Sequence, residues 1–222
     1  FMSDQEATDK LLREVEGKTI ISPRVIKFRT GRRLKSWNKN VIALGLASGF
    51  VEPLESTSIQ LIMTGLTRLI YLSPFPQVTQ TIVDQYNEES QTEQERVRDF
   101  IILHYCATQR DDSEFWRYCA NMQVPDALAR RIQMFRERAH VWQKDGELFR
   151  TDSWIQVMLY QGIWPEHYHH LVTAMPQEDL VRFLEGIRTT INRAVEQMPT
   201  HQEFLDRYAR VGEEIWAKAM MK

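Results

Sequence analysis

The chain has 222 residues, of which 43% are hydrophobic and 26% are charged, and its formal net charge at pH 7 is −2. This composition is typical of a soluble globular protein of one or two domains with a real core. The small net charge gives no electrostatic reason to expect a nucleic acid or an anionic membrane as partner, and no apolar run approaches transmembrane length. We therefore expect neither kind of partner.

The N-terminus and the cysteines bear on where the protein works. The sequence begins Phe-Met-Ser-Asp-Gln-Glu, without the basic start and apolar core of a signal peptide, and resembles a cut made inside a longer protein. Cys106 and Cys119 are too few for a disulfide framework, and both lie in helical patterns with aromatic neighbours. We expect buried free thiols and a cytoplasmic location.

The first predicted elements are a helix and two strands. Residues 3–15 predict a short helix, because Ser3 can serve as N-cap and Glu6 stands three residues later, as in a capping box. Residues 25–30 and residues 41–46 predict two strands, the second more buried than the first. Two strands alone make no stable sheet, so we expect the remaining strands to lie outside this sequence.

From residue 56 onward the pattern is almost entirely helical. A first apolar stripe runs from Ile59 to Ile70, and Pro74 and Pro76 then end the helix and mark the best domain boundary. Further stripes follow, and the clearest amphipathic helix lies between Pro176 and Pro199. These signals predict two domains, residues 1–75 and residues 76–222.

The stretch from residue 45 to residue 62, GLASGFVEPLESTSIQLI, carries the strongest chemical signal. An apolar run breaks at small residues, passes through a loop and opens into a helix at Ser56-Thr57-Ser58. The N–H groups of a helix start have no intrahelical partner and lie at the positive end of the dipole, so this start suits an anion. Judged by the residues alone, helix capping and dipole compensation by Glu55 are the more frequent explanation.

This stretch resembles, nearly letter for letter, the signature of the flavin-dependent halogenases of the tryptophan halogenase family. The resemblance extends through residues 28–40, 100–116 and 161–169 and reaches Met198-Pro199. It covers essentially the whole chain but only the C-terminal part of the family's length. The family's Gly-rich dinucleotide fingerprint, catalytic lysine segment and Trp-x-Trp-x-Ile-Pro motif are absent.

The resemblance implies a mainly α fold with a small β part. Residues 1–75 would form the C-terminal edge of an α/β flavin monooxygenase-like domain with the halide loop, and residues 76–222 a helical substrate domain. The N-terminal part of the same enzyme would be the missing partner, so the chain alone is expected to be incomplete and inactive.

The same resemblance implies roles for individual residues. Glu55 would lie beside the reacting carbon of the substrate and stabilise the cationic ring or help to remove its proton. The backbone amides of Thr57 and Ser58 would bind the halide; many members have glycine in place of Ser58, which affects the loop conformation rather than the N–H donor. The expected contacts of the flavin are Gly45, Ala47, Ser48 and Ser56. We assign Glu52 a role in shaping the loop.

Phe149 and Trp154 are the expected substrate contacts. Aromatic side chains in a helical stretch are usually part of the core, but the resemblance places substrate contacts in this segment. Leu148-Phe149 stands about where halogenases of free tryptophan have an aromatic pair, whereas their paired tyrosines and acidic residue have no counterpart. This departure favours an indole-like or larger, bound substrate.

The resemblance implies an FADH2-dependent halogenase. A separate flavin reductase would supply reduced FAD, chloride or bromide would be oxidised to hypohalous acid, and a lysine outside this chain would pass the halogen to a small electron-rich aromatic substrate. Two alternatives remain open. One is a flavin monooxygenase that hydroxylates instead, and the other is a non-catalytic helical binding module if the fragment is the natural product.

The histidines predict no metal site. His167 and His170 are three residues apart, but no third ligand is obvious, and His169 belongs to the family pattern. We expect His104 to be a hydrogen-bonded core histidine rather than a base.

Overall fold

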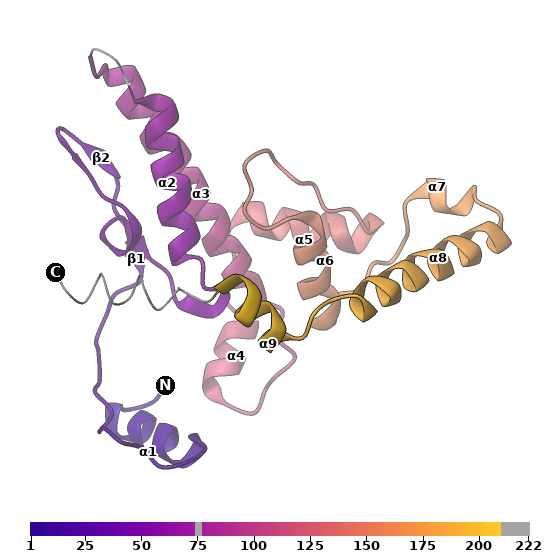
Figure 1. Cartoon of the computed structure of the whole chain (residues 1–222), viewed down its shortest axis with the longest axis horizontal. Coiled ribbons are helices and arrows are strands. Elements are labelled where there is room, and N and C mark those ends of the chain that lie inside the picture. The colour runs from indigo at the N-terminus through magenta and orange to yellow at the C-terminus, as the bar shows by residue number, and fades with distance from the viewer. Residues whose placement is uncertain (74–76, 210–222) are drawn as a thin grey trace. The chain divides into compact units, whose positions relative to one another are not determined.

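The computed structural model describes residues 1–73 and 77–209 (Figure 1), and the chain divides into two units after His167. Helices predominate and the strands are short, which confirms the predicted fold class. The predicted boundary at Pro74 and Pro76 falls on positions outside the described residues and stays a prediction. No helix in the described part is both long and apolar enough to cross a membrane.

The first unit contains six helices and four strands among its described residues. In chain order these are α1 (Asp4–Glu14), β1 (Gly31–Arg32), β2 (Trp37–Asn38), β3 (Val41–Ile42), β4 (Gly49–Phe50), α2 (Ser58–Leu72), α3 (Gln80–Cys106), α4 (Glu114–Ala120), α5 (Asp126–Arg138) and α6 (Thr151–Tyr160). Two 3-10 turns, η1 (Gly45–Ala47) and η2 (Pro53–Glu55), lie in the segment that leads to α2.

The capping box predicted at the N-terminus of α1 is confirmed. The Ser3 side chain accepts a hydrogen bond from the Glu6 amide, and the Glu6 carboxylate accepts one from the Ser3 amide in return. These bonds to its ionised form lower the pKa of Glu6, the bond from the Ser3 amide first and the bond from the Ser3 side chain second. The sequence thus predicted the start of this helix correctly.

The predicted strands are wrong in their extent. Residues 25–30 pair with no strand in the described chain, and of residues 41–46 only Val41–Ile42 is a strand, followed by η1. The ladders are antiparallel and two residues long: β1 pairs with β4 and β2 with β3. A β-branched, alternating run needs a partner ladder to become a strand, and the described residues offer none to residues 25–30.

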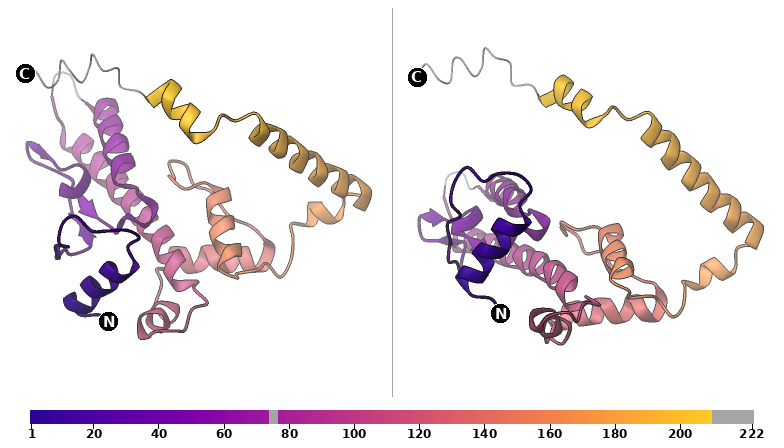
Figure 2. Two further views of the ribbon diagram at one scale, coloured as in Figure 1. Left: turned by 60° about the horizontal axis from the view of Figure 1, so that its bottom comes forward. Right: turned by 90° about the horizontal axis from the view of Figure 1, so that it is seen from below.

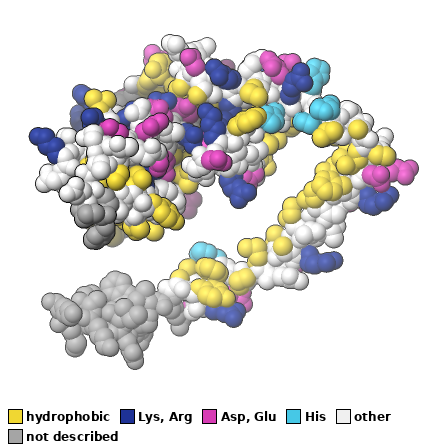
Figure 3. Space-filling model, turned by 90° about the horizontal axis from the view of Figure 1, so that it is seen from above, with side chains coloured by type: hydrophobic (Ala, Val, Ile, Leu, Met, Phe, Trp, Pro, Cys, Tyr) yellow, Lys and Arg dark blue, Asp and Glu magenta, His cyan; other side chains and the backbone are white. Residues whose placement is uncertain are grey.

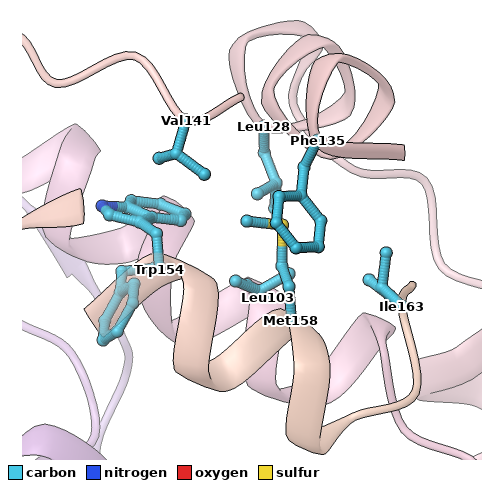
Figure 4. Packing of buried hydrophobic residues seen from close by; sticks show 8 residues of the cluster. Leu103, Leu128, Phe135, Val141, Trp154, Met158 and Ile163 are labelled. Atoms are coloured by element: carbon cyan, nitrogen blue, oxygen red, sulfur yellow. The ribbon is translucent and has the colours of Figure 1, made fainter. Parts of the chain in front are cut away.

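Helix α3 is the central element of the first unit. It contacts α2, α4, α5, α6 and β2, and it runs beside α2 in every view of Figures 1 and 2. One face of α3 contributes Phe100 and Leu103 to the hydrophobic core. Figure 4 shows Leu103 among side chains of α5 and α6. The other members of this core are Leu128, Phe135, Val141, Trp154, Met158 and Ile163.

Polar contacts fix α2 to α3. The Tyr86 hydroxyl donates to the carbonyl of Gly65, where a Cβ would lie 2.8 Å from Leu44. The Arg68 guanidinium donates to Glu89 at 3.0 Å and to Glu93 at 2.9 Å. Burial opposes the charge of Arg68, but the bonds to Glu93 and Glu89 outweigh it and raise the pKa of Arg68.

The second unit contains α7 (His170–Thr173), α8 (Gln177–Glu196), α9 (His201–Phe204) and the π-helical turn η3 (Leu205–Ala209). The predicted amphipathic helix is confirmed as α8, which begins directly after Pro176. Hydrophobic side chains gather along this helix (Figure 3), and within the described residues none of them is buried.

Candidate functional site

Two tight turns shape the segment that the sequence analysis singled out. The η1 turn begins at Gly45, whose φ of +54° disfavours other residues. A Cβ at Gly45 would also lie 2.8 Å from Ile62 of α2, so glycine lets this turn approach the helix closely. The η2 turn ends at Ser56, which adopts a left-handed conformation with a φ of +52°. The chain therefore changes direction sharply on both sides of β4.

Ser48 is buried, and its hydroxyl forms hydrogen bonds with other side chains of the protein. It lies 3.1 Å from the Ser36 hydroxyl and accepts a hydrogen bond of 2.7 Å from Gln94 of α3. The Ser36 hydroxyl in turn lies 2.9 Å from that of Ser90, also on α3. Of the predicted flavin contacts, Ala47 and Ser56 are exposed, and the Ala47 carbonyl accepts from Arg33. This network anchors the turn to α3.

Helix α2 begins without a side-chain cap. Thr57 is its N-cap residue and is buried, yet no cap hydrogen bond from its hydroxyl is present among the described residues. The helix capping that the residues alone suggested for Ser56-Thr57-Ser58 is therefore not found at the N-cap position, Thr57. Since the first N–H groups of a helix have no intrahelical partner, the amides at Thr57 and Ser58 remain available to an anion.

A cavity of about 520 Å³ lies beside this helix start. Its wall includes Gly45, Ser48, Thr57 and Ser58 of the predicted site, together with residues of α2, α3 and α4. Ala47, Glu55 and Ser56, by contrast, are not part of the wall in the described structure. The structure thus brings both predicted halide residues and two of the predicted flavin contacts to one cavity.

Glu52 and Tyr105 form a polar pair on the wall of this cavity. Burial, and after it a hydrogen bond to the Glu52 carboxylate, raises the pKa of Tyr105 to about 12. The Oε1 atom of Glu52 is buried and has no partner among the described residues. Burial also raises the pKa of the nearby Cys119 thiol. The role of Glu52 in shaping the loop stays a prediction, and sequence reasoning missed its pairing with Tyr105.

Glu55 lies against His104 of α3. The Oε1 atom of Glu55 is 2.9 Å from Nε2 of His104, and the two side chains are 34% and 17% exposed. The Nδ1 atom of His104 lies 2.9 Å from the carbonyl oxygen of Phe100, one turn earlier in α3. The expected hydrogen bond of His104 is thus confirmed. Its contact with Glu55 was missed, because no local pattern connects residues 49 positions apart in the sequence.

Phe149 and Trp154 belong to the helical core. Phe149 stacks on Phe100 with ring centroids 3.8 Å apart, and Trp154 meets Phe100 edge-on. Trp154 is 3% exposed, and the Arg131 guanidinium lies 4.0 Å from its ring centroid. Because Phe100 also packs edge-on against His104, a row of rings joins Phe149 to the partner of Glu55. Whether Phe149 and Trp154 contact substrate stays a prediction.

His167 is the last residue of the first unit, and His169 and His170 belong to the second. His169 and His170 stack on each other with ring centroids 4.6 Å apart. In the described part of the chain, no group of three or more His, Cys, Asp or Glu side chains is placed to hold a metal ion.

Known proteins are similar to this chain over most of its length. A flavin-dependent halogenase from Xanthomonas campestris is 42% identical, with a TM-score of 0.88, and the match covers 94% of this chain and 42% of that one. BrvH, a flavin-dependent halogenase from Brevundimonas sp. BAL3, is 42% identical, with a TM-score of 0.84 and coverage of 92% and 42%. Tryptophan 7-halogenase KtzQ of Kutzneria sp. (strain 744) is 28% identical over 231 residues, which are 93% of this chain and 42% of the relative.

The chain therefore spans less than half the length of these relatives. The family described as tryptophan halogenase matches residues 1–177. That match includes the whole segment from η1 to α2, the Glu55–His104 contact and the helical core. The chain belongs to the tryptophan halogenase family.

Proposed function

We propose that this chain forms the halide-binding and proton-accepting part of a flavin-dependent halogenase that acts on an electron-rich, indole-like ring. The observation that carries the proposal is the uncapped start of α2 on the cavity wall, with Glu55 two residues before the N-cap. The names of the relatives, flavin-dependent halogenases and tryptophan halogenases, support the same reaction.

The helix start provides the halide site. Thr57 and Ser58 are the N-cap and first residue of α2, so their amides lie at the positive end of the helix dipole and need no partner within the helix. Chloride or bromide would be held there by backbone donors, which serine supplies as well as glycine does. Because Thr57 is buried, the bound ion would be partly shielded from water, which strengthens its interaction with the amides.

The residues around η1 and η2 fit the edge of a flavin through their backbone. Ala47 and Ser56 are exposed, whereas the space beside Gly45 is filled by Ile62 of the same chain. Gly45 and Ser48 would thus shape the turn, and Ala47 and Ser56 would face the cofactor. A reduced flavin bound there, with oxygen, would supply the oxidising power that converts halide to hypohalous acid, and a separate reductase would provide it.

Glu55 would accept the proton that leaves the halogenated carbon. When this proton moves to the carboxylate, the C–H electron pair returns to the ring and restores its aromaticity. A carboxylate that is 34% exposed is accessible to substrate while still held by protein on one side. Phe149 would border the substrate ring, and Trp154 would support Phe149 and Phe100 from within the core.

The full-length natural protein tests this proposal. With a flavin reductase, oxygen, bromide and indole, we expect mass spectrometry to show brominated indole, formed only when bromide is present. The present chain alone is expected to give none. Hydroxylated indole formed without halide would contradict the proposal and support the monooxygenase alternative.

A further inference from the structure

The two contacts of His104 indicate which of its ring nitrogens carry a proton. A backbone carbonyl oxygen only accepts hydrogen bonds, so the Nδ1 atom 2.9 Å from the Phe100 carbonyl must carry a proton. If the ring were neutral, Nε2 would then present a lone pair to Oε1 of Glu55 at 2.9 Å. Two lone pairs repel each other at this distance, and therefore a proton lies between Nε2 and Oε1. The proposed role of Glu55 as proton acceptor requires an ionised carboxylate, which assigns this proton to Nε2.

The surroundings of His104 hold its ring in this orientation. The ring lies edge-on to Phe100, with centroids 4.9 Å apart, and Phe100 is itself fixed by stacking on Phe149. His104 is on the central helix α3, one turn beyond Phe100, whereas Glu55 is at the end of the short η2 turn. The rigid partner in the contact is therefore the histidine, and the carboxylate on the turn is the group that it orients.

We infer that His104 is a positioning residue for Glu55. It holds Oε1 of the carboxylate through the proton on Nε2 and leaves Oε2 to face the substrate. The Phe100 carbonyl fixes the protonated Nδ1, so that Nε2 is the nitrogen aimed at Glu55. This inference rests on the proposed halogenase function, because it assigns His104 to the step in which Glu55 accepts the proton of the halogenated carbon.

Two substitutions separate positioning from packing. His104→Gln places an amide N–H near the position of Nε2 and can still donate to Glu55. His104→Phe keeps the edge-on ring contact with Phe100 but has no donor. A hydrogen bond to a charged group is strong enough that its loss should lower kcat by about 10- to 100-fold in the phenylalanine variant. The glutamine variant should keep most of the wild-type kcat.

The full-length protein is assayed with reduced flavin, bromide and indole, and again with indole deuterated at its ring carbons. If the phenylalanine variant misplaces the base, removal of the ring hydrogen becomes slower, and its deuterium isotope effect should exceed that of the wild type. A 1,3-diketone trap measures hypohalous acid separately, and its yield should be unchanged. Glu88→Gln, at an exposed position of α3, is the matched control and should behave as wild type.

The outcomes distinguish the inference from the function on which it rests. Trapped hypohalous acid together with equal kcat and isotope effects in wild type and both variants would overturn the role of His104 alone. Equal losses in the glutamine and phenylalanine variants would overturn it as well, since a donor at Nε2 would then be insufficient. A wild-type protein that yields no trapped hypohalous acid would overturn both the halogenase proposal and this inference.

Discussion

The helical core and the segment from β1 to η2 are both built on α3, but they are held by different forces. The core is apolar, with Leu103 and Met158 fully buried between helices. The β1–η2 segment instead depends on polar side chains of α3, which bond to Trp37, Ser36 and Ser48. One helix can therefore carry a packed apolar core on one face and a hydrogen-bonded polar site on another.

The polar face of α3 follows helical spacing. Asn87, Ser90 and Gln94 contact the β1–η2 segment, and His104 continues the same stripe after Val97 and Ile101. Residues three and four apart lie on one face of a helix, which explains why these side chains meet the same segment. Directional bonds of this kind fix the geometry of a site more closely than apolar contacts do.

In the β1–η2 segment, loss of the Glu55 carboxylate should have the largest effect on turnover. Glu55→Gln in the full-length protein keeps the shape of the side chain but removes its ability to take up a proton. We expect turnover of indole and bromide to fall by about 10²- to 10⁴-fold, as for a lost general base, with flavin binding unchanged. Steady-state kinetics and flavin titration measure the two effects. Wild-type turnover would remove Glu55 from the mechanism.

A cavity in the helical core should lower the free energy of unfolding more than it changes the geometry of the site. Leu128→Ala deletes a buried side chain of α5 and should lower the free energy of unfolding by about 2–5 kcal/mol. Arg130→Ala, on the exposed side of the same helix, is the control and should change it by less than about 0.5 kcal/mol. Denaturant unfolding of the full-length protein gives both values. Similar losses in the two variants would show that α5 does not contribute a packed core.

The sequence predicted those features of the two regions that depend on a local pattern of residues. The capping box of α1, the stripes of α2 and α8, and the turn-to-helix segment at residues 45–62 are all visible as spacing or composition. The strand at residues 25–30 failed because strand formation depends on a distant partner. The Glu55–His104 contact was also not predicted. The polar positions Asn87, Ser90 and Gln94 nevertheless indicate in the sequence that α3 has a second, polar face.

The ion pair between α2 and α3 combines features of both regions, because it is a polar contact whose side chains are nearly as buried as those of the core. The side chains of Arg68 and Glu93 are only 12% and 10% exposed. Glu93→Gln leaves the guanidinium with Glu89 as its remaining carboxylate, and we expect the free energy of unfolding to fall by about 1.5–3 kcal/mol. Glu88→Gln, the exposed neighbour on α3, should have almost no effect. Equal stability of the two variants would place the Arg68 network among weak surface ion pairs.

Tyr105 gives the smallest expected effect and tests the polar side of the cavity by pH. Its pKa is raised to about 12 from 10.0, first by burial and then by the hydrogen bond to Glu52. A raised folded-state pKa means that folding favours the protonated phenol, so the stabilisation is complete below about pH 10 and is lost as pH rises towards about 12. Unfolding of the full-length protein at several alkaline pH values should show this decline, and Tyr105→Phe should flatten it. An equally steep decline in the phenylalanine variant would mean that another group, and not the Tyr105–Glu52 pair, titrates in this range.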